Sequence, residues 1–130
     1  MIETYIETYT VYALQHNITG RIYVGLTKHL KERIYSHLYA LRKNRHVNKG
    51  MQDDFNKYGE DFSIFKLEDV DCTQHVGYAT NMPTAREKYW QCKLKTYDPA
   101  HGYNREDPKY RRLKALKTSE AIQQRRYKHG

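Results

Sequence analysis

The chain has 130 residues, which is enough for one compact domain with a short appendage and excludes a multidomain protein. Lys and Arg number 23 against 15 Asp and Glu, so the formal charge is +8 and polyanions are the expected partners. No apolar run approaches the roughly 20 residues of a membrane span, the acidic start does not resemble a signal peptide, and two cysteines are too few for a disulfide scaffold, so we expect a soluble, cytoplasmic protein with no membrane contact.

The first expected element is a β-hairpin. Strand-like alternation runs over residues 2–14, and a second short run at 21–25 follows a turn at 17–20. A two-residue loop in the middle of that turn pairs positions whose numbers have an odd sum. Tyr12 and Tyr23 are then expected on the same face of the sheet.

A helix is expected next, from about residue 28 to residue 43, with Thr27 as its N-cap. Its apolar residues recur at helical spacing and form one stripe toward the core, made of Leu30, Ile34, Leu38 and Leu41. Arg33 and His37 lie one turn apart on one shoulder of this stripe, beside the small Ala40. We expect this shoulder to border a cleft.

A second, short helix is expected over residues 49–58, with three side chains turned inward and Gly59 ending it in the left-handed conformation. Those inward side chains are Met51, Phe55 and Tyr58. Residues 62–67 predict a well-buried third strand, and the Asp-rich stretch 69–81 predicts an irregular segment.

The last expected helix starts at Pro83 and runs to about residue 95, with Glu87 on the same face as Trp90 and Leu94. Together the elements predict an α/β (α+β) domain over residues 1–104, in which a small three-stranded antiparallel sheet is flanked by helices. Residues 105–130 are helix-prone but polar, and they predict a basic helical tail that contacts DNA.

Positive charge is concentrated in two segments. Residues 21–49 carry a net charge of +7 and residues 105–130 carry +6, whereas the intervening 50–104 carry −3. This distribution predicts two contacts on one long anion, although a solvated basic face is the simpler alternative. The candidate DNA contacts are Lys28, Arg42, Lys43 and Arg45 in the first segment, and Arg111, Arg112, Arg125 and Arg126 in the second.

Common nucleotide and hydrolase motifs are absent, including a glycine-rich phosphate loop, G-x-S-x-G and His-Glu-x-x-His. Four Cys and His residues raise the alternative of a zinc-stabilised interaction domain, namely Cys72, His75, Cys92 and His101. Only the first two are close in sequence, so single thiols packed in a small core explain the cysteines better.

The order and spacing of several short segments resemble the GIY-YIG nuclease family, most closely the catalytic modules of phage intron-encoded homing endonucleases. The resemblance covers about residues 8–104, and Thr10 departs from it by replacing the family's first glycine. The matching segments are Thr10-Val11-Tyr12, Tyr23-Val24-Gly25, Arg33 with His37, Asn56-Lys57-Tyr58-Gly59 with Phe62, Arg86-Glu87-Lys88-Tyr89-Trp90, and Gly102-Tyr103-Asn104.

The resemblance implies a metal-dependent endonuclease that hydrolyses phosphodiester bonds of double-stranded DNA and acts as a monomer or a transient dimer. It implies that Glu87 holds the divalent metal, Mg²⁺ or Mn²⁺, and that Arg33 holds the scissile phosphate. Tyr12 or Tyr23 would orient or deprotonate the attacking water. His37 and Asn104 would support the site, and His46 would lie near it.

These residue types suit that chemistry. A guanidinium on a rigid helix can bind two phosphate oxygens, and a carboxylate is a hard oxygen ligand of the kind Mg²⁺ prefers. A free tyrosine has a pKa of about 10, so a phenol acting as a base needs a cationic neighbour, for which Arg33, Lys28 and the metal are candidates.

Simpler roles exist for each residue taken alone. Glu87 could complete a capping box with Thr84, Arg33 could be a solvated helix residue, and the tyrosines could be ordinary strand residues. Two other functions also remain: a restriction-type or branch-selective nuclease of the same fold, and a DNA-binding module without catalysis.

Overall fold

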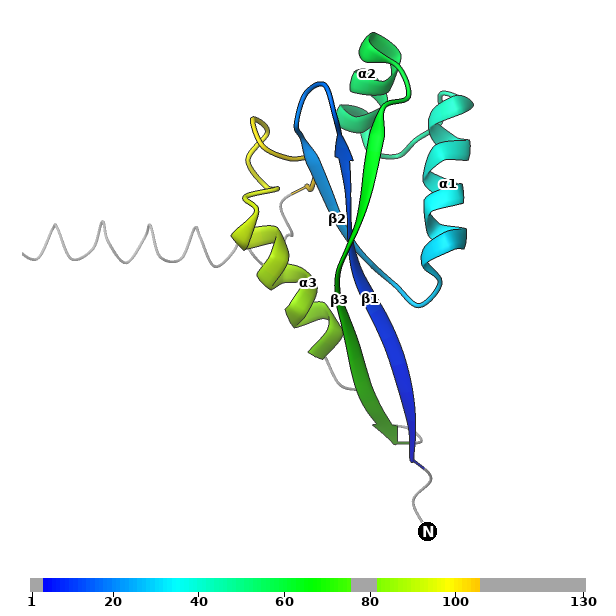
Figure 1. Ribbon diagram of the computed structural model, residues 1–130, viewed down its shortest axis with the longest axis vertical. Coiled ribbons are helices and arrows are strands. Elements are labelled where there is room, and N and C mark those ends of the chain that lie inside the picture. Colours follow the sequence, from blue (N-terminus) through cyan, green and yellow to red (C-terminus); the bar gives the residue numbers. More distant parts are fainter. Residues whose placement is uncertain (1–3, 76–81, 106–130) are drawn as a thin grey trace, which may run out of the picture.

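The computed structural model describes residues 4–75 and 82–105 as a three-stranded antiparallel sheet with helices on both faces (Figure 1). The strand order is β2-β1-β3, so β1 is the central strand and pairs with both of the others. The fold expected from the sequence is therefore confirmed. The strands are β1 (Thr4–His16), β2 (Ile22–Thr27) and β3 (Phe62–His75), and the helices are α1 (Leu30–Arg42), α2 (Lys49–Tyr58) and α3 (Met82–Lys93).

The β1–β2 hairpin has the expected odd-sum register. Tyr12 pairs with Gly25 and Leu14 pairs with Tyr23, while Gly20 in the connecting turn has a φ of 76° that favours glycine. Tyr12 and Tyr23 consequently share one face of the sheet, and their ring centroids are 6.2 Å apart. The predicted pairing of the two phenols is confirmed.

Alternation along β1 builds two apolar clusters, one on each face of the sheet. Tyr12 and Leu14 pack with residues of α1 and α2, whereas Val11 and Ala13 pack against Trp90 of α3 and neighbouring residues. The sheet is therefore buried between α1 with α2 on one side and α3 on the other (Figure 1).

Helix α1 begins two residues later than expected. Thr27 is the last residue of β2 rather than the N-cap, and its hydroxyl accepts a hydrogen bond from the backbone N–H of His29 over 3.1 Å. The rest of the prediction holds, because the apolar stripe faces the first cluster with Ile34 and Leu41 buried.

Helix α2 has the expected bounds but not the expected details at its end. Met51 is buried, while Tyr58 is 40% exposed because it lies in the last turn, beyond the cluster. Gly59 has φ 88° and ψ −177°, a conformation open to glycine but different from the left-handed helical one. At the other end, the Asn48 side chain caps the helix by accepting from the Met51 N–H over 3.0 Å.

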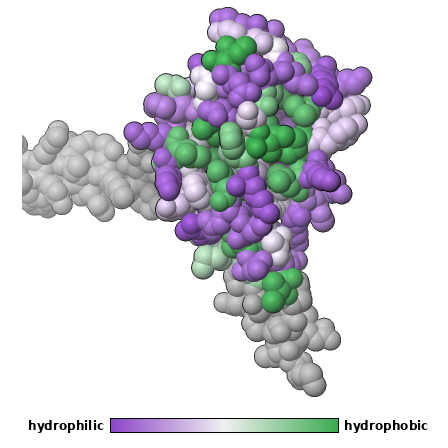
Figure 2. Space-filling model, in the orientation of Figure 1, coloured by the Kyte–Doolittle hydropathy of each residue, from purple (hydrophilic) through white to green (hydrophobic). Residues whose placement is uncertain are grey.

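Strand β3 differs most from expectation. It continues well past residue 67, and its first half is not well buried, since Ile64 and Phe65 are each nearly half exposed. It is an edge strand that the helices cover only in part, and Figure 2, which has the β3 edge of the sheet in front, shows apolar surface near the middle of the molecule.

The stretch from residue 69 to His75 is strand, not irregular structure. Asp69 and Asp71 accept hydrogen bonds from Thr10 and Thr8 on β1, over 2.8 and 2.6 Å. Such cross-strand polar pairs stabilise a sheet at solvent-exposed positions. Thr10 thus replaces the family's glycine without breaking the strand, and the one irregularity in register falls just after it, between Val11 and Tyr12. Residues 76–81 lie outside the described residues.

Helix α3 starts at Met82, which places Thr84 inside the helix and removes the capping-box reading of Glu87. After α3 the chain turns back to the outer edge of β2, where Gly102 pairs with Ile22. A Cβ on Gly102 would collide with the backbone of Thr96, so glycine is required for this close approach. Within the described ranges, no helix is both long and apolar enough to cross a membrane.

Candidate active site

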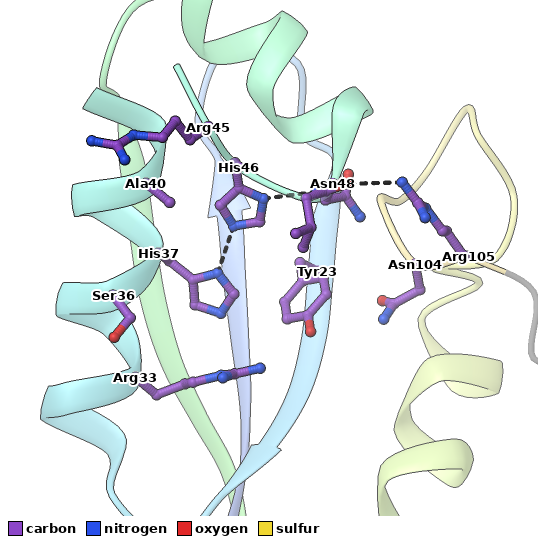
Figure 3. A pocket seen from close by; sticks show the side chains of 11 residues that line it. Tyr23, Arg33, Ser36, His37, Ala40, Arg45, His46, Asn48, Asn104 and Arg105 are labelled. Atoms are coloured by element: carbon purple, nitrogen blue, oxygen red, sulfur yellow. Dashed lines mark hydrogen bonds between the residues drawn. The ribbon is translucent and has the colours of Figure 1, made fainter. Parts of the chain in front are cut away.

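A cleft of about 400 Å³ opens between α1, the loop that follows it, β2 and the segment after α3 (Figure 3). Four parts of the chain that are distant in sequence therefore meet here. The lining residues are Tyr23, Arg33, Ser36, His37, Ala40, Arg45, His46, Val47, Asn48, Asn104 and Arg105. The shoulder of α1 that carries Arg33, His37 and Ala40 borders a cleft as expected.

Tyr12 lies beneath this cleft and is fully buried. It reaches its position because the residue opposite on β2 is Gly25: a Cβ there would stand 2.5 Å from the Tyr12 phenol oxygen. Tyr23, in contrast, lines the cleft itself, and its ring meets the His37 ring edge-on at 5.2 Å between centroids. The two phenols are thus neighbours with different exposure.

Consecutive hydrogen bonds lead from the loop after α1 to the Tyr12 phenol, and Figure 3 shows the first two of them, from Asn48 to His46 and from His46 to His37. The backbone N–H of Asn48 donates to Nδ1 of His46 over 3.0 Å, Nε2 of His46 is 2.8 Å from Nδ1 of His37, and Nε2 of His37 is 2.8 Å from the phenol oxygen of Tyr12. These contacts link two histidines and one tyrosine from three separate elements.

The direction of this chain follows from its first member, because an amide N–H can only donate. Nδ1 of His46 must therefore accept, which leaves the proton of a neutral His46 on Nε2 and makes Nδ1 of His37 an acceptor in turn. A neutral His37 then carries its proton on Nε2 and donates it to the oxygen of Tyr12. The phenol is held as an acceptor, with its own proton directed elsewhere.

Both histidines are held in the neutral form. Burial, the neighbouring His46 and the Arg33 charge lower the pKa of His37 to about 4. Burial and Arg33 also lower the pKa of His46 below its ordinary value. The single-proton tautomers assigned above are therefore the forms present at neutral pH.

Arg33 projects from α1 toward the two tyrosines, and their phenols raise its pKa, Tyr12 most strongly. The effect is mutual. Burial and Tyr23 raise the pKa of Tyr12 well above its usual range, Arg33 opposes this, and the negative charge of Glu87 adds to the increase. Tyr12 consequently lies within electrostatic reach of both the guanidinium and the carboxylate, although Glu87 comes from the other side of the sheet.

The position of Glu87 depends on the anchoring of α3 to β3. Arg86 forms a fork with the Glu68 carboxylate, with its closest N–O distance at 2.6 Å, and Trp90 donates to the same carboxylate over 3.1 Å. These two residues flank Glu87 in the helix. They fix the turn of α3 that carries it.

Asn104 binds the edge of β2 through its side chain. Its Oδ1 accepts from the Val24 N–H and its Nδ2 donates to the Val24 carbonyl, both over 2.9 Å. The amide therefore replaces a neighbouring strand at the residue beside Tyr23. Its polar atoms are engaged by the backbone, so its part in the site is to hold β2.

The structure does not bring all predicted DNA contacts to the cleft. Arg45 and His46 line it, whereas Lys28 pairs with Glu7, Arg42 pairs with Glu60, and Lys43 lies over the outward-facing ring of Tyr39. The acidic partners neutralise the first two, a pairing that the charge count could not reveal. The candidates in the tail, namely Arg111, Arg112, Arg125 and Arg126, lie outside the described residues.

The ligands available for a metal are few. No group of three or more His, Cys, Asp or Glu side chains forms a metal site within 4–75 and 82–105, and the two cysteines form no disulfide. The zinc alternative gains no support there. A single carboxylate such as Glu87, acting with water and phosphate oxygens, is the kind of ligand set that Mg²⁺ accepts.

Sequence reasoning missed two contributors to the cleft. Arg105 was assigned to the tail, yet its guanidinium donates to the Val47 carbonyl over 2.7 Å and stands at the cleft wall. The Asn48 N–H sets the direction of the hydrogen bonds through His46 and His37. Because it is a backbone group, the type of residue at position 48 does not indicate this role. In the sequence, the feature that could have placed Arg105 at the cleft is its position directly after Asn104.

Comparisons with known proteins agree with this geometry. Residues 8–104 match the family model described as the GIY-YIG catalytic domain. Intron-associated endonuclease 1 of Enterobacteria phage T4 is 28% identical over 94 residues. That match covers 72% of this chain but 35% of the relative, so the chain spans only about a third of that protein's length.

Two solved structures are also similar. The catalytic domain of intron endonuclease I-TevI superposes with a TM-score of 0.65 at 26% identity, covering 77% of this chain and 95% of that one. A second structure of the catalytic domain of homing endonuclease I-TevI gives a TM-score of 0.64 at 26% identity, covering 76% and 99%.

Proposed function

Because this chain belongs to the GIY-YIG catalytic-domain family, we propose that it is a metal-dependent endonuclease that hydrolyses phosphodiester bonds in double-stranded DNA. The observation that carries the proposal is the environment of Tyr12. The Tyr12 phenol is hydrogen-bonded to neutral His37, and its pKa responds to the Arg33 guanidinium and to the charge of the Glu87 carboxylate. These groups come from both faces of the sheet. A module that only binds DNA would not need these groups to meet at one phenol.

In the proposed reaction Arg33 binds the scissile phosphate and stabilises the charge that grows on it. The Tyr12 phenol, whose pKa is raised by burial, first gives its own proton to solvent; the phenolate then takes a proton from the attacking water as the new oxygen–phosphorus bond forms and the bond to the departing oxygen breaks. His37 and Arg33 both face the Tyr12 oxygen and stabilise negative charge there. This favours Tyr12 over Tyr23 as the base, while Tyr23, in the cleft wall, orients the water or the phosphate.

A divalent ion, Mg²⁺ or Mn²⁺, held by Glu87 would supply positive charge beside the phosphate and would stabilise the charge that develops on the departing oxygen. His46 orders His37, and Asn104 keeps β2 and Tyr23 in place. The domain boundary at residue 104, with the basic tail 105–130 as an additional DNA contact, remains part of the proposal.

Plasmid nicking tests the function. Wild-type protein should nick supercoiled DNA when Mg²⁺ or Mn²⁺ is added and not in EDTA. Glu87→Ala and Arg33→Ala should bind DNA but lose cleavage by at least about a hundredfold, as expected when a group that stabilises the transition state is removed. Binding without any cleavage by the wild type would contradict the proposal and leave the non-catalytic DNA-binding module.

The same experiment can separate nucleases of this fold by substrate. Cleavage of a randomised duplex library with mapping of the ends reports the sequence preference and the stagger, and parallel reactions on branched DNA test structure selectivity. Dependence of double-strand cutting on protein concentration distinguishes a transient dimer from a monomer that cuts the strands in turn.

A further inference from the structure

Gln91 is a polar residue buried on α3, with only 7% of its surface exposed. Its helix neighbours Trp90 and Leu94 pack against the apolar cluster of the sheet that includes Val24 and Val70. Burying an amide in such surroundings costs free energy unless its donor and its acceptor are both paired. An apolar side chain would fill this place without that requirement, so the glutamine needs a specific reason.

Both ends of the Gln91 amide are bound. Its Nε2 donates to the Val24 carbonyl over 3.3 Å, and its Oε1 accepts from the phenol of Tyr97. Because a carbonyl can only accept, Val24 determines which end of the amide faces β2. The side chain is therefore satisfied and held in one orientation.

The Val24 carbonyl does not depend on Gln91 for a partner. Asn104 already donates to it over 2.9 Å, and a carbonyl oxygen has two lone pairs, of which Gln91 takes the second. The bond from Gln91 is thus additional to what the pairing of β2 requires. What it adds is a direct link from α3 to β2.

This link joins two parts of the candidate active site. Glu87 precedes Gln91 by four residues, so the two side chains leave α3 one turn apart on the same side of the helix. On β2, Val24 directly follows Tyr23, which lines the cleft. The hydrogen bond therefore connects the turn that carries Glu87 to the part of the strand that carries Tyr23.

Helix α3 is held at both edges of the sheet. The Glu68 carboxylate on β3 binds Arg86 and Trp90. Gln91 binds β2, the strand at the opposite edge. At about 100° per residue, Glu87 lies between Trp90 and Gln91 around the helix axis. One anchor alone would let the helix pivot, whereas anchors on both sides of Glu87 fix its direction.

We propose that Gln91 is a positioning residue that sets the separation between the metal ligand Glu87 and Tyr23, by tying the turn of α3 that carries the carboxylate to β2. The inference rests on the proposed function in taking Glu87 as the metal ligand. Gln91 contacts neither the metal nor the DNA in this role, and it acts through the placement of the helix.

Binding of Mn²⁺ to the full chain, followed by NMR, tests this role without cleavage. Mn²⁺ broadens nearby signals with a steep dependence on distance, so the broadening at Tyr23 relative to that at Glu87 reports where the ion lies between them. In Gln91→Leu this ratio should fall. The Mn²⁺ concentration for half-maximal broadening at Glu87 should rise about three- to tenfold, which corresponds to the loss of one neutral hydrogen bond.

Stability should not follow the same course. Leucine is apolar and of similar size, and Asn104 still donates to the Val24 carbonyl, so the urea midpoint of Gln91→Leu should be unchanged or higher. A changed position of the ion in a protein of undiminished stability is a result that a purely structural role of Gln91 would not give.

Tyr97→Phe is the matched control, because it removes the other hydrogen bond of the same amide and leaves the donor to Val24. It should retain the wild-type ratio. Val70→Ala loosens the same apolar cluster from β3, and it should lower the urea midpoint without changing the ratio.

The role of Gln91 would be overturned by an unchanged ratio and Mn²⁺ concentration in Gln91→Leu, or by equal changes in Tyr97→Phe. It would also be overturned if Mn²⁺ did not broaden Glu87 in the wild type. A wild type that binds Mn²⁺ at Glu87 but cuts no DNA would count against the proposed nuclease and not against this positioning role.

Discussion

Tyr12 and Gly25 face each other across the β1–β2 hairpin so closely that a Cβ on residue 25 would stand 2.5 Å from the phenol oxygen. Tyr12 has no space into which it can retreat, because it is fully buried and its oxygen contacts His37 at 2.8 Å. The glycine therefore sets the position of the phenol that we assign to catalysis.

Gly25→Ala should displace the Tyr12 ring, and it should cost about 1–3 kcal/mol of unfolding free energy, as overpacking of a core does. Plasmid nicking should fall by at least about tenfold if the phenol acts in the transition state. Gly50→Ala is the control: its Cβ would meet nothing closer than 3.5 Å, and alanine favours a helix, so stability and activity should be maintained. Normal nicking by the Gly25 variant would show that the position of Tyr12 does not matter.

His46 is expected to set the tautomer of His37. In His46→Leu the donor to Nδ1 of His37 is lost, so His37 should populate both tautomers and the cleavage rate should fall. His46→Gln retains an N–H donor and should recover much of the rate. Nitrogen-15 NMR of the histidine rings reads the tautomer directly in the metal-free protein. If the ring of His37 carries its proton on Nδ1 in the wild type, the direction assigned to the chain is wrong.

The neutral state of His37 makes stability depend on pH in acid. The pKa of this residue is about 4 in the folded protein and 6.5 as the ordinary value, so between these values the unfolded chain binds a proton that the folded chain does not. Stability contributed by the neutral imidazole is therefore complete above 6.5 and decreases as the pH falls toward 4.

The total effect of that linkage is on the order of 3 kcal/mol, since one pKa unit corresponds to about 1.4 kcal/mol. Urea denaturation at a series of pH values should show the wild type losing more stability over this interval than His37→Gln does. Parallel pH dependence of the two proteins would mean that other groups account for the acid sensitivity.

Glu68 is expected to influence the metal requirement without touching the metal. Glu68→Ala removes the carboxylate that Arg86 and Trp90 share, so α3 should be held less firmly and Glu87 should be positioned less well. The Mg²⁺ concentration needed for half-maximal nicking should rise severalfold, with a smaller change in the rate at saturating metal. Glu60→Ala breaks a comparable pair with Arg42 far from α3 and serves as the control.

The parts of the fold that follow from local rules could be predicted from the sequence. The odd-sum register of the hairpin follows from the turn, and the stripe of α1 follows from helical periodicity, so the shared face of Tyr12 and Tyr23 and the shoulder bearing Arg33 could be inferred. The second half of β3 could not, because Asp69 and Asp71 usually indicate a loop. Their hydrogen-bond partners, Thr10 and Thr8, are about 60 residues earlier in the chain.

The candidate site shows the same division. Residue types indicated His37 and Arg33, but the order of donors through His46 depends on a backbone amide that every residue except proline has. Counting charges marked Lys28, Arg42 and Arg45 alike as DNA contacts. Only the structure shows that acidic partners neutralise the first two and that Arg45 is among the residues that line the cleft.

The amide of Asn104 has a consequence for solubility as well as for the site. A strand edge with an open N–H and C=O is a template for pairing with another chain. At Val24 this one side chain binds both groups, and the Gln91 side chain also donates to the carbonyl over 3.3 Å, so strand addition beside Tyr23 is blocked. Loss of the amide at residue 104 would therefore leave the Val24 N–H without this partner, which would favour self-association of the protein at this edge.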